Sequence, residues 1–235
     1  MQRYAGERLY SATDLVAFLE CEHLTGLDLR ALDDPALAAE RNEADESAQL
    51  IASKGDQHER RHLDDLRGRG QGVVDIAAEG GDVDNRAQAT LAAMRRGVEV
   101  IYQATLRDGC WVGHADFLHR VDGQASAFGA WAYEVADTKL ARSTKAKFLV
   151  QLAFYSDLVA KAQGTVPRLM HVVLGDGTER AFCVADYARY FDSLRSRFLE
   201  AVGGFANGAR TSPYPVPCDH CDLCHWSARC EARPR

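Results

Sequence analysis

The sequence predicts an α/β protein in which helices flank a small mixed sheet. Three features support this prediction. Helical segments come first, two pairs of segments rich in aromatic and β-branched residues then indicate hairpins, and two more helical segments alternate with those hairpins. A proline-led tail with crowded cysteines closes the chain. The expected order is therefore helices, hairpin, helix, hairpin, helix and cysteine tail.

The predicted helices share apolar residues at helical spacing or a composition rich in strong helix formers. Several also have a capping serine before them or a glycine behind them. They cover residues 11–21, 36–67, 85–97, 143–164 and 186–205. The first hairpin pairs residues 110–121 with 130–140, and the second covers 168–184 and turns at "GDG".

Length and composition suggest one globular domain. The chain has 235 residues, which suits one large domain or two small ones, and we expect a single domain in three parts. These parts are a helical part at 1–110, a core at 111–207 and a cysteine tail at 208–235. No apolar run is long enough to span a membrane, and the N-terminus lacks the layout of a signal peptide. The expected location is the cytoplasm.

Two carboxylates and a lysine in the first hairpin suggest a metal site. Strand alternation puts Asp137 and Lys139 of "YEVADTK" on one face, about 6.6 Å apart along the strand. Asp116 lies beside Phe117 in an apolar strand, where an unpaired acid is costly. If the two strands pair directly, both carboxylates converge with the lysine on a site for Mg²⁺ or Mn²⁺. The alternative is a surface ion pair on an edge strand.

Polar and basic residues follow this hairpin. Gln151 and Tyr155 lie four apart on the next helix, where they can face a nucleic-acid strand or simply pack. Four cations and no acid occupy residues 139–147. Of these, Arg142 and Lys145 are the expected phosphate contacts, although a basic run is often only a solvated face. The net charge of −6 gives no general attraction for nucleic acid but leaves room for a local basic groove.

Together these residues resemble the RecB-like branch of the PD-(D/E)XK nucleases. The matching motifs, in order, are G-x-x-D at 113–116, D-x-K at 137–139 and Q-x-x-x-Y at 151–155. His58, in "KGDQHE", matches a histidine that this branch commonly has in an upstream helix. The segments "YSATDL", "IYQATL", "DTKLAR" and "VLGDG" are similar, in the same order, to those of bacterial RecB-like putative nucleases. The resemblance covers nearly the whole chain.

The resemblance implies a restriction-endonuclease-like core and Mg²⁺- or Mn²⁺-dependent hydrolysis of DNA, on single strands or ends. His58, Asp116 and Asp137 would hold the metal, and Asp116, Asp137 and Lys139 would be catalytic. Gln151 and Tyr155 would contact DNA. Proteins of this type often continue into an RNase H-like domain or a helicase, so such a partner is expected. A catalytically silent DNA-binding or scaffold module is the alternative.

The tail reads C-x2-C-x2-C-x5-C. One zinc is possible but cramped, with His220 and His225 as further ligands, and the ferredoxin run has a different last spacing. The resemblance implies instead a [4Fe–4S] cluster that joins the chain ends, as in CRISPR-associated RecB-like nucleases. Its ligands would be Cys21, Cys221, Cys224 and Cys230. Cys218 is left over, and Cys110 and Cys183 are expected to be buried apolar residues.

The segment "HERRH" fits the zinc-protease pattern H-E-x-x-H. His58 and His62 would share a helix face, but no H-x-x-G-x-x-H extension follows, and Glu79, a candidate third ligand, lies in glycine-rich sequence. Arg60 and Arg61 would also crowd cations beside the metal. A zinc protease is therefore a minor alternative, and the nuclease interpretation makes Glu59 and His62 incidental.

Overall fold

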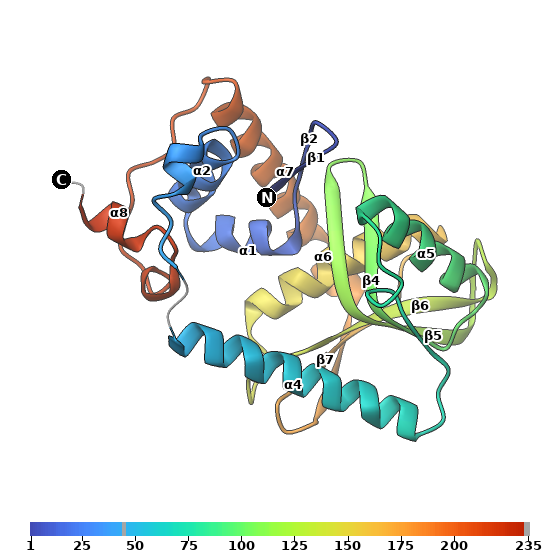
Figure 1. Cartoon of the computed structure of the whole chain (residues 1–235). Coiled ribbons are helices and arrows are strands. Elements are labelled where there is room, and N and C mark those ends of the chain that lie inside the picture. The colour runs from blue at the N-terminus through green and yellow to red at the C-terminus, as the bar shows by residue number, and fades with distance from the viewer. Residues whose placement is uncertain (44–45, 233–235) are drawn as a thin grey trace. The chain divides into compact units, whose positions relative to one another are not determined.

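The structure is a computed structural model that describes residues 1–43 and 46–232 (Figure 1). The chain divides into two compact units. One unit, here the sheet unit, consists of Ser53–Phe191. The other, here the helical unit, combines Met1–Ala52 with Asp192–Arg235. No helix among the described residues has the length and apolarity needed to cross a membrane.

The sheet unit is built on a mixed sheet, as the sequence predicts, but the sheet has six strands where the two expected hairpins supply four. Its strands, in spatial order, are β3 (Val73–Asp75), β4 (Val100–Asp108), β5 (Trp111–Ser126), β6 (Gly129–Thr138), β7 (Leu169–Val173) and β8 (Glu179–Cys183). β4, β5 and β6 form an antiparallel meander, and β7 and β8 form the second hairpin. β3 runs parallel to β4, and β7 runs parallel to β6. β6 is therefore an interior strand.

Helices pack on this sheet. They are α4 (Glu46–Gly68), α5 (Val83–Arg95) and α6 (Ala146–Gln163), and α7 (Val184–Ala206) follows β8 (Figure 1). Leu63 and Leu66 of α4 bury their side chains against Val100, Phe117 and Ala136 of the central strands. α5 packs on β4, and α6 runs along β4, β5, β6 and β7. The expected flanking of the sheet by helices is confirmed.

Four local predictions were wrong. Residues 36–67 are not one helix, because Pro35 starts a short helix, α3 (Pro35–Ala38), capped by Asp34, and α4 begins only at Glu46. β4 was missed, although its β-branched and aromatic residues are typical of a strand. α6 has Lys145 rather than a serine at its N-cap. Cys183 is exposed and Cys110 is only partly buried.

The helical unit holds a two-stranded ribbon and short helices. These are β1 (Gln2–Tyr4), β2 (Glu7–Leu9), α1 (Ala12–Glu20), α2 (Glu22–Ala31), α3, the last part of α7, a 3₁₀ turn at Cys221–Leu223 and α8 (Ser227–Glu231). Ser11 and Asp14 form the capping box of α1, with Asp14 Oδ2 2.8 Å from the Ser11 backbone nitrogen. The predicted start of this helix is confirmed.

The cysteine tail packs into the core of the helical unit. Trp226 is fully buried against Leu24 and Leu27. Its indole nitrogen donates to Asp28 Oδ1 over 3.0 Å, and His225 Nε2 lies 2.7 Å from the same oxygen. The sequence shows no core pattern in the tail, so this burial depends on one aromatic residue that pattern analysis did not single out.

Candidate functional site

Asp116 and Asp137 meet on adjacent strands of the central hairpin. Phe117 pairs with Ala136, so the two aspartates come next to each other in the register. Asp116 Oδ2 accepts two hydrogen bonds from Thr138, one from its backbone nitrogen over 2.9 Å and one from its hydroxyl over 3.0 Å. The two strands therefore pair directly, and Asp116 and Asp137 converge as the sequence predicts.

Asp137 is 0% exposed and lies on an interior strand. Its carboxylate forms an ion pair with Lys139, whose side chain is 22% exposed. The alternative of a surface ion pair on an edge strand is therefore excluded by position. Apart from Lys139 and the neighbouring Asp116 carboxyl, neither Asp137 oxygen has a hydrogen-bond partner among the described residues. A buried carboxylate with so few partners is costly and favours a bound cation or a proton.

The two carboxyls are electrostatically coupled. Burial, followed by the charge of Asp137, raises the pKa of Asp116 to about 7. Burial also raises the pKa of Asp137, against the opposing effect of the Lys139 ammonium. Asp116 keeps part of its surface open to solvent, whereas Asp137 does not. The pair therefore holds a proton near neutral pH unless a cation replaces it.

Glu59 is a third acid at this site, and the sequence interpretation treated it as incidental. Burial and the charge of Asp116 raise the pKa of Glu59. Its carboxylate accepts hydrogen bonds from the side chain of Gln103 and from the hydroxyl of Tyr102 on β4. The sequence places Glu59 beside His58 on one helix, but which side of that helix faces the carboxylates depends on how α4 packs.

His58 is buried beside the end of β7. Its Nε2 lies 3.4 Å from the carbonyl oxygen of Val173, and the Lys139 backbone nitrogen donates to that same oxygen over 2.8 Å. Val173 pairs with Thr138, so His58 lies next to the strand end that carries the carboxylates. Across residues 1–43 and 46–232, however, no three His, Cys, Asp or Glu side chains are arranged to hold an ion as they stand.

The two histidines of "HERRH" have different surroundings. His62 packs edge-on against Phe117, with ring centroids 4.9 Å apart. Burial lowers the pKa of His62. His58 instead contacts the Val173 carbonyl group. The two side chains therefore contact different strands, His62 the ring of Phe117 on β5 and His58 the end of β7.

A polar cavity of 540 Å³ opens beside Glu59. It lies between α4 and the start of the sheet and is lined by Asp56, Glu59, Arg60, Leu63, Asp64, Arg67, Asp75, Ala77, Tyr102 and Gln103. Because Glu59 and Asp116 interact electrostatically, this cavity lies near the carboxylate pair.

Helix α6 covers the other neighbours of the pair. A Cβ atom at Gly113 would come within 2.8 Å of the Leu158 side chain and 3.0 Å of the Tyr155 side chain, so the packing as it stands uses the space that glycine leaves free. Tyr155 is 6% exposed, and burial and the charge of Asp137 raise the pKa of its hydroxyl. Gln151 Nε2 donates to that hydroxyl over 3.1 Å. Tyr155 is thus a buried neighbour of the Asp116–Asp137 pair, whereas the side chain of Gln151 is partly exposed.

The basic loop between β6 and α6 is exposed. Arg142 and Lys145 both lie at the surface. The loop is fastened to the end of β7, where the Gly175 nitrogen donates to the Ala141 carbonyl oxygen over 3.1 Å. A Cβ atom at Gly175 would collide with the backbone of Leu140. Arg142 and Lys145 therefore lie shortly after Lys139, on a loop whose backbone is held against the end of β7.

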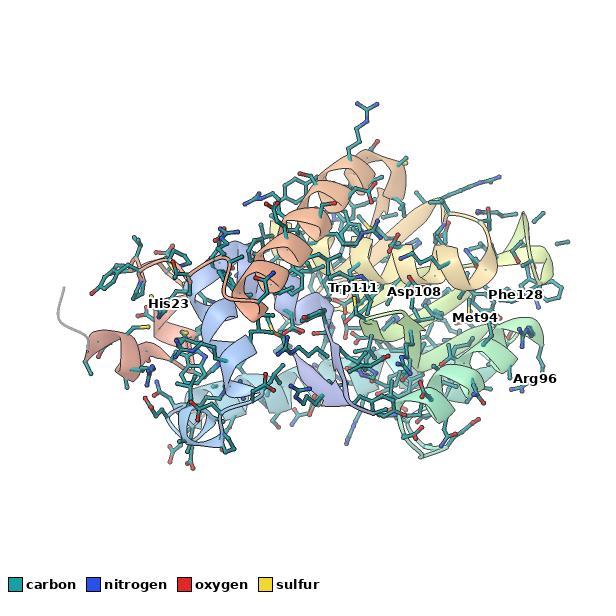
Figure 2. All side chains as sticks on the ribbon, turned by 90° about the horizontal axis from the view of Figure 1, so that it is seen from above. His23, Met94, Arg96, Asp108, Trp111 and Phe128 are labelled. Atoms are coloured by element: carbon teal, nitrogen blue, oxygen red, sulfur yellow. The ribbon has the colours of Figure 1, made fainter. Side chains whose placement is uncertain are left out.

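Five cysteines line one cavity of 340 Å³ in the helical unit. They are Cys21, Cys218, Cys221, Cys224 and Cys230. The cavity is also lined by His23, labelled in Figure 2, whose Nδ1 lies 2.8 Å from the Pro213 carbonyl oxygen near the start of the tail. The four expected cluster ligands are thus gathered in one place, together with the fifth thiol.

Comparisons with known proteins add no assignment. No protein-family model matches the chain, and a search of curated proteins finds no similar sequence.

Proposed function

We propose that this protein is a metal-dependent DNA nuclease of the RecB-like PD-(D/E)XK type, acting on single-stranded DNA or DNA ends. One observation carries the proposal. Asp137 is a fully buried carboxylate on an interior strand, and it faces a second carboxyl, Asp116, and one ammonium group, Lys139. Maintaining this arrangement for stability alone would be unfavourable, because buried like charges repel and apolar replacements cost less.

The residues fit a hard divalent cation. Asp116 and Asp137 would hold Mg²⁺ or Mn²⁺ through carboxylate oxygens, which such ions prefer. Glu59 adds a third acid, and His58 lies beside the same strand ends. The bound ion would lower the pKa of a water molecule that it binds, and it would place positive charge beside the phosphate.

The chain's own residues would do the rest. Lys139 would neutralise charge that develops on the phosphate, since its ammonium already reaches Asp137 from a partly exposed position. Arg142 and Lys145 would bind neighbouring phosphates of the strand. Gln151 would contact the DNA, and Tyr155, which is buried, would position Gln151 through their hydrogen bond.

We further propose a [4Fe–4S] cluster held by Cys21, Cys221, Cys224 and Cys230. Their shared cavity supports this assignment, because thiolates are the usual ligands of such a cluster. The cluster would stabilise the helical unit by linking α1 and α2 to the tail. A helicase or an RNase H-like domain is the partner that the resemblance implies.

The test is degradation of end-labelled single-stranded DNA by anaerobically purified protein with Mn²⁺. Asp137→Asn should abolish cleavage, because it removes a metal ligand, whereas Asp122→Asn, an exposed acid on the same hairpin, should leave it unchanged. Parallel reactions on duplex DNA and RNA define the substrate. Equal cleavage by wild type and Asp137→Asn would reject the site. DNA binding without cleavage by the wild type would instead favour the silent binding module.

A further inference from the structure

Cys218 is the thiol of the cysteine cavity that the proposed ligand set leaves out. Its Sγ lies 4.0 Å from Cys221 Sγ, and its backbone nitrogen donates to the Cys221 sulfur over 3.4 Å. Its thiol also donates to the carbonyl oxygen of Glu20 over 3.7 Å, directly before Cys21. Because Cys218 is exposed, small oxidants in solution can reach it.

The backbone between the two cysteines suits a disulfide. The Cys221 nitrogen donates to the Cys218 carbonyl oxygen over 2.9 Å and closes a four-residue turn. Such turns keep their end Cα atoms within about 7 Å, and disulfides need about 4.4–6.8 Å. The sulfur atoms would have to approach by only about 2 Å to reach bonding distance.

Cys224 is held differently. Its Sγ accepts a hydrogen bond from the backbone nitrogen of Trp226 over 3.4 Å. Trp226 is fully buried, so this contact keeps the Cys224 sulfur against the core. Cys218 is therefore the better placed partner for Cys221.

We propose that Cys218 and Cys221 form a reversible disulfide that removes Cys221 from the cluster ligands when the protein meets a peroxide. This inference rests on the proposed cluster. The Cys218 thiolate attacks one peroxide oxygen, which breaks the O–O bond and leaves a sulfenic acid and water once a proton is taken up. The Cys221 thiolate, released from the cluster, then attacks that sulfur and displaces hydroxide, which leaves as a second water once another proton is taken up. In all, the two sulfur atoms lose two electrons, and the peroxide gains these electrons together with two protons from solvent.

The experiment treats anaerobically purified full-length protein with hydrogen peroxide and follows bound iron, free thiols and peptide masses. Trypsin releases residues 211–229, which contain Cys218, Cys221 and Cys224. In the wild type this peptide should become two hydrogens lighter, with fragmentation placing the bond between Cys218 and Cys221. Iron should be lost in parallel, and dithiothreitol with added iron and sulfide should restore it.

Cys218→Ser and Cys183→Ser are the matched variants, since Cys183 is an exposed cysteine of the sheet unit. Cys183→Ser should behave as the wild type. Cys218→Ser should bind iron but lose the light peptide, and its iron loss should be irreversible because unpaired thiols oxidise further. Absence of the Cys218–Cys221 bond in the wild type, or equal recovery of Cys218→Ser, would overturn the inference. A wild type that never binds iron would reject the cluster, and iron-free protein would then still show whether the disulfide forms.

Discussion

Asp116 is held by both donors of a single residue, Thr138. One carboxylate oxygen of Asp116 accepts hydrogen bonds from the backbone nitrogen and from the hydroxyl of Thr138. Thr138 directly follows Asp137 in the chain. The second residue of the D-x-K motif therefore orients the acid of the neighbouring strand. Hydrogen bonds to an ionised carboxylate favour its charged form, so Thr138 opposes the burial that raises the pKa of Asp116.

Thr138→Val should weaken metal binding and cleavage. The change removes one hydrogen bond to Asp116 and keeps the side-chain shape, so the pKa of Asp116 should rise further. A hydrogen bond to a charged group contributes about 1.5–3 kcal/mol, which corresponds to roughly a 10- to 100-fold loss of Mn²⁺ affinity at pH 7. Isothermal titration calorimetry measures the Mn²⁺ affinity. Thr138→Ser keeps the hydroxyl and should retain most of that affinity.

Metal affinity should depend on pH through the Asp116–Asp137 pair. With a pKa near 7, Asp116 is protonated below neutrality, and a metal must displace that proton. Affinity for Mn²⁺ should fall by up to about tenfold per pH unit below pH 7 and level off above it. A flat profile between pH 5.5 and 8.5 would show that no proton is displaced.

The same carboxyls should destabilise the metal-free fold at neutral pH. The folded pKa of Asp116 is raised above its unfolded value of 3.8, so the folded state holds more protons between about pH 4 and 7, and stability falls as pH rises through this range. Asp137→Asn relieves the repulsion. It should raise the melting temperature at pH 8 without metal by about 2–8 °C, if about 1–2 kcal/mol is recovered. A lower melting temperature would show that the ion pair with Lys139 outweighs the repulsion.

Gly113→Ala should destabilise the protein and disturb the site. The added methyl group would press on Leu158 and Tyr155, and overpacking of this kind costs about 1–3 kcal/mol. Gly203→Ala is the matched control, because a Cβ atom there meets no neighbour and lies within α7. Gly203→Ala should instead raise the free energy of unfolding, measured by urea denaturation, by about 0.5–1 kcal/mol. Equal stability changes in both variants would argue against the close approach of α6.

Arg142→Gln and Lys145→Gln should weaken binding to single-stranded DNA through charge alone. Each lost phosphate contact should reduce the slope of log affinity against log salt by about 0.7. Arg189→Gln removes an exposed cation elsewhere and should leave the slope unchanged. Fluorescence anisotropy at several salt concentrations, with Ca²⁺ in place of Mn²⁺, gives the slopes. Unchanged slopes for the loop variants would place the DNA elsewhere.

The sequence predicts the hairpin and its residues better than their surroundings. Strand alternation and turn residues sufficed to pair Asp116 with Asp137, because both depend on local periodicity. The role of Glu59 could not be predicted, since it depends on which side of α4 faces the sheet. β4 was missed although its composition is typical of a strand, so its omission is not due to tertiary packing. The burial of Tyr155 and Trp226 depends on tertiary packing, which neither helical spacing nor a cysteine-rich composition indicates.

The most direct test of the account is Mn²⁺ binding by the Asp116–Asp137 pair in protein without DNA. Electron paramagnetic resonance of free Mn²⁺ at pH 8 counts bound ions in the wild type, Asp137→Asn and Asp122→Asn. We expect the wild type and Asp122→Asn to bind Mn²⁺ alike and Asp137→Asn to bind at least tenfold more weakly. Equal binding by all three proteins would contradict the assignment of this pair as the metal site.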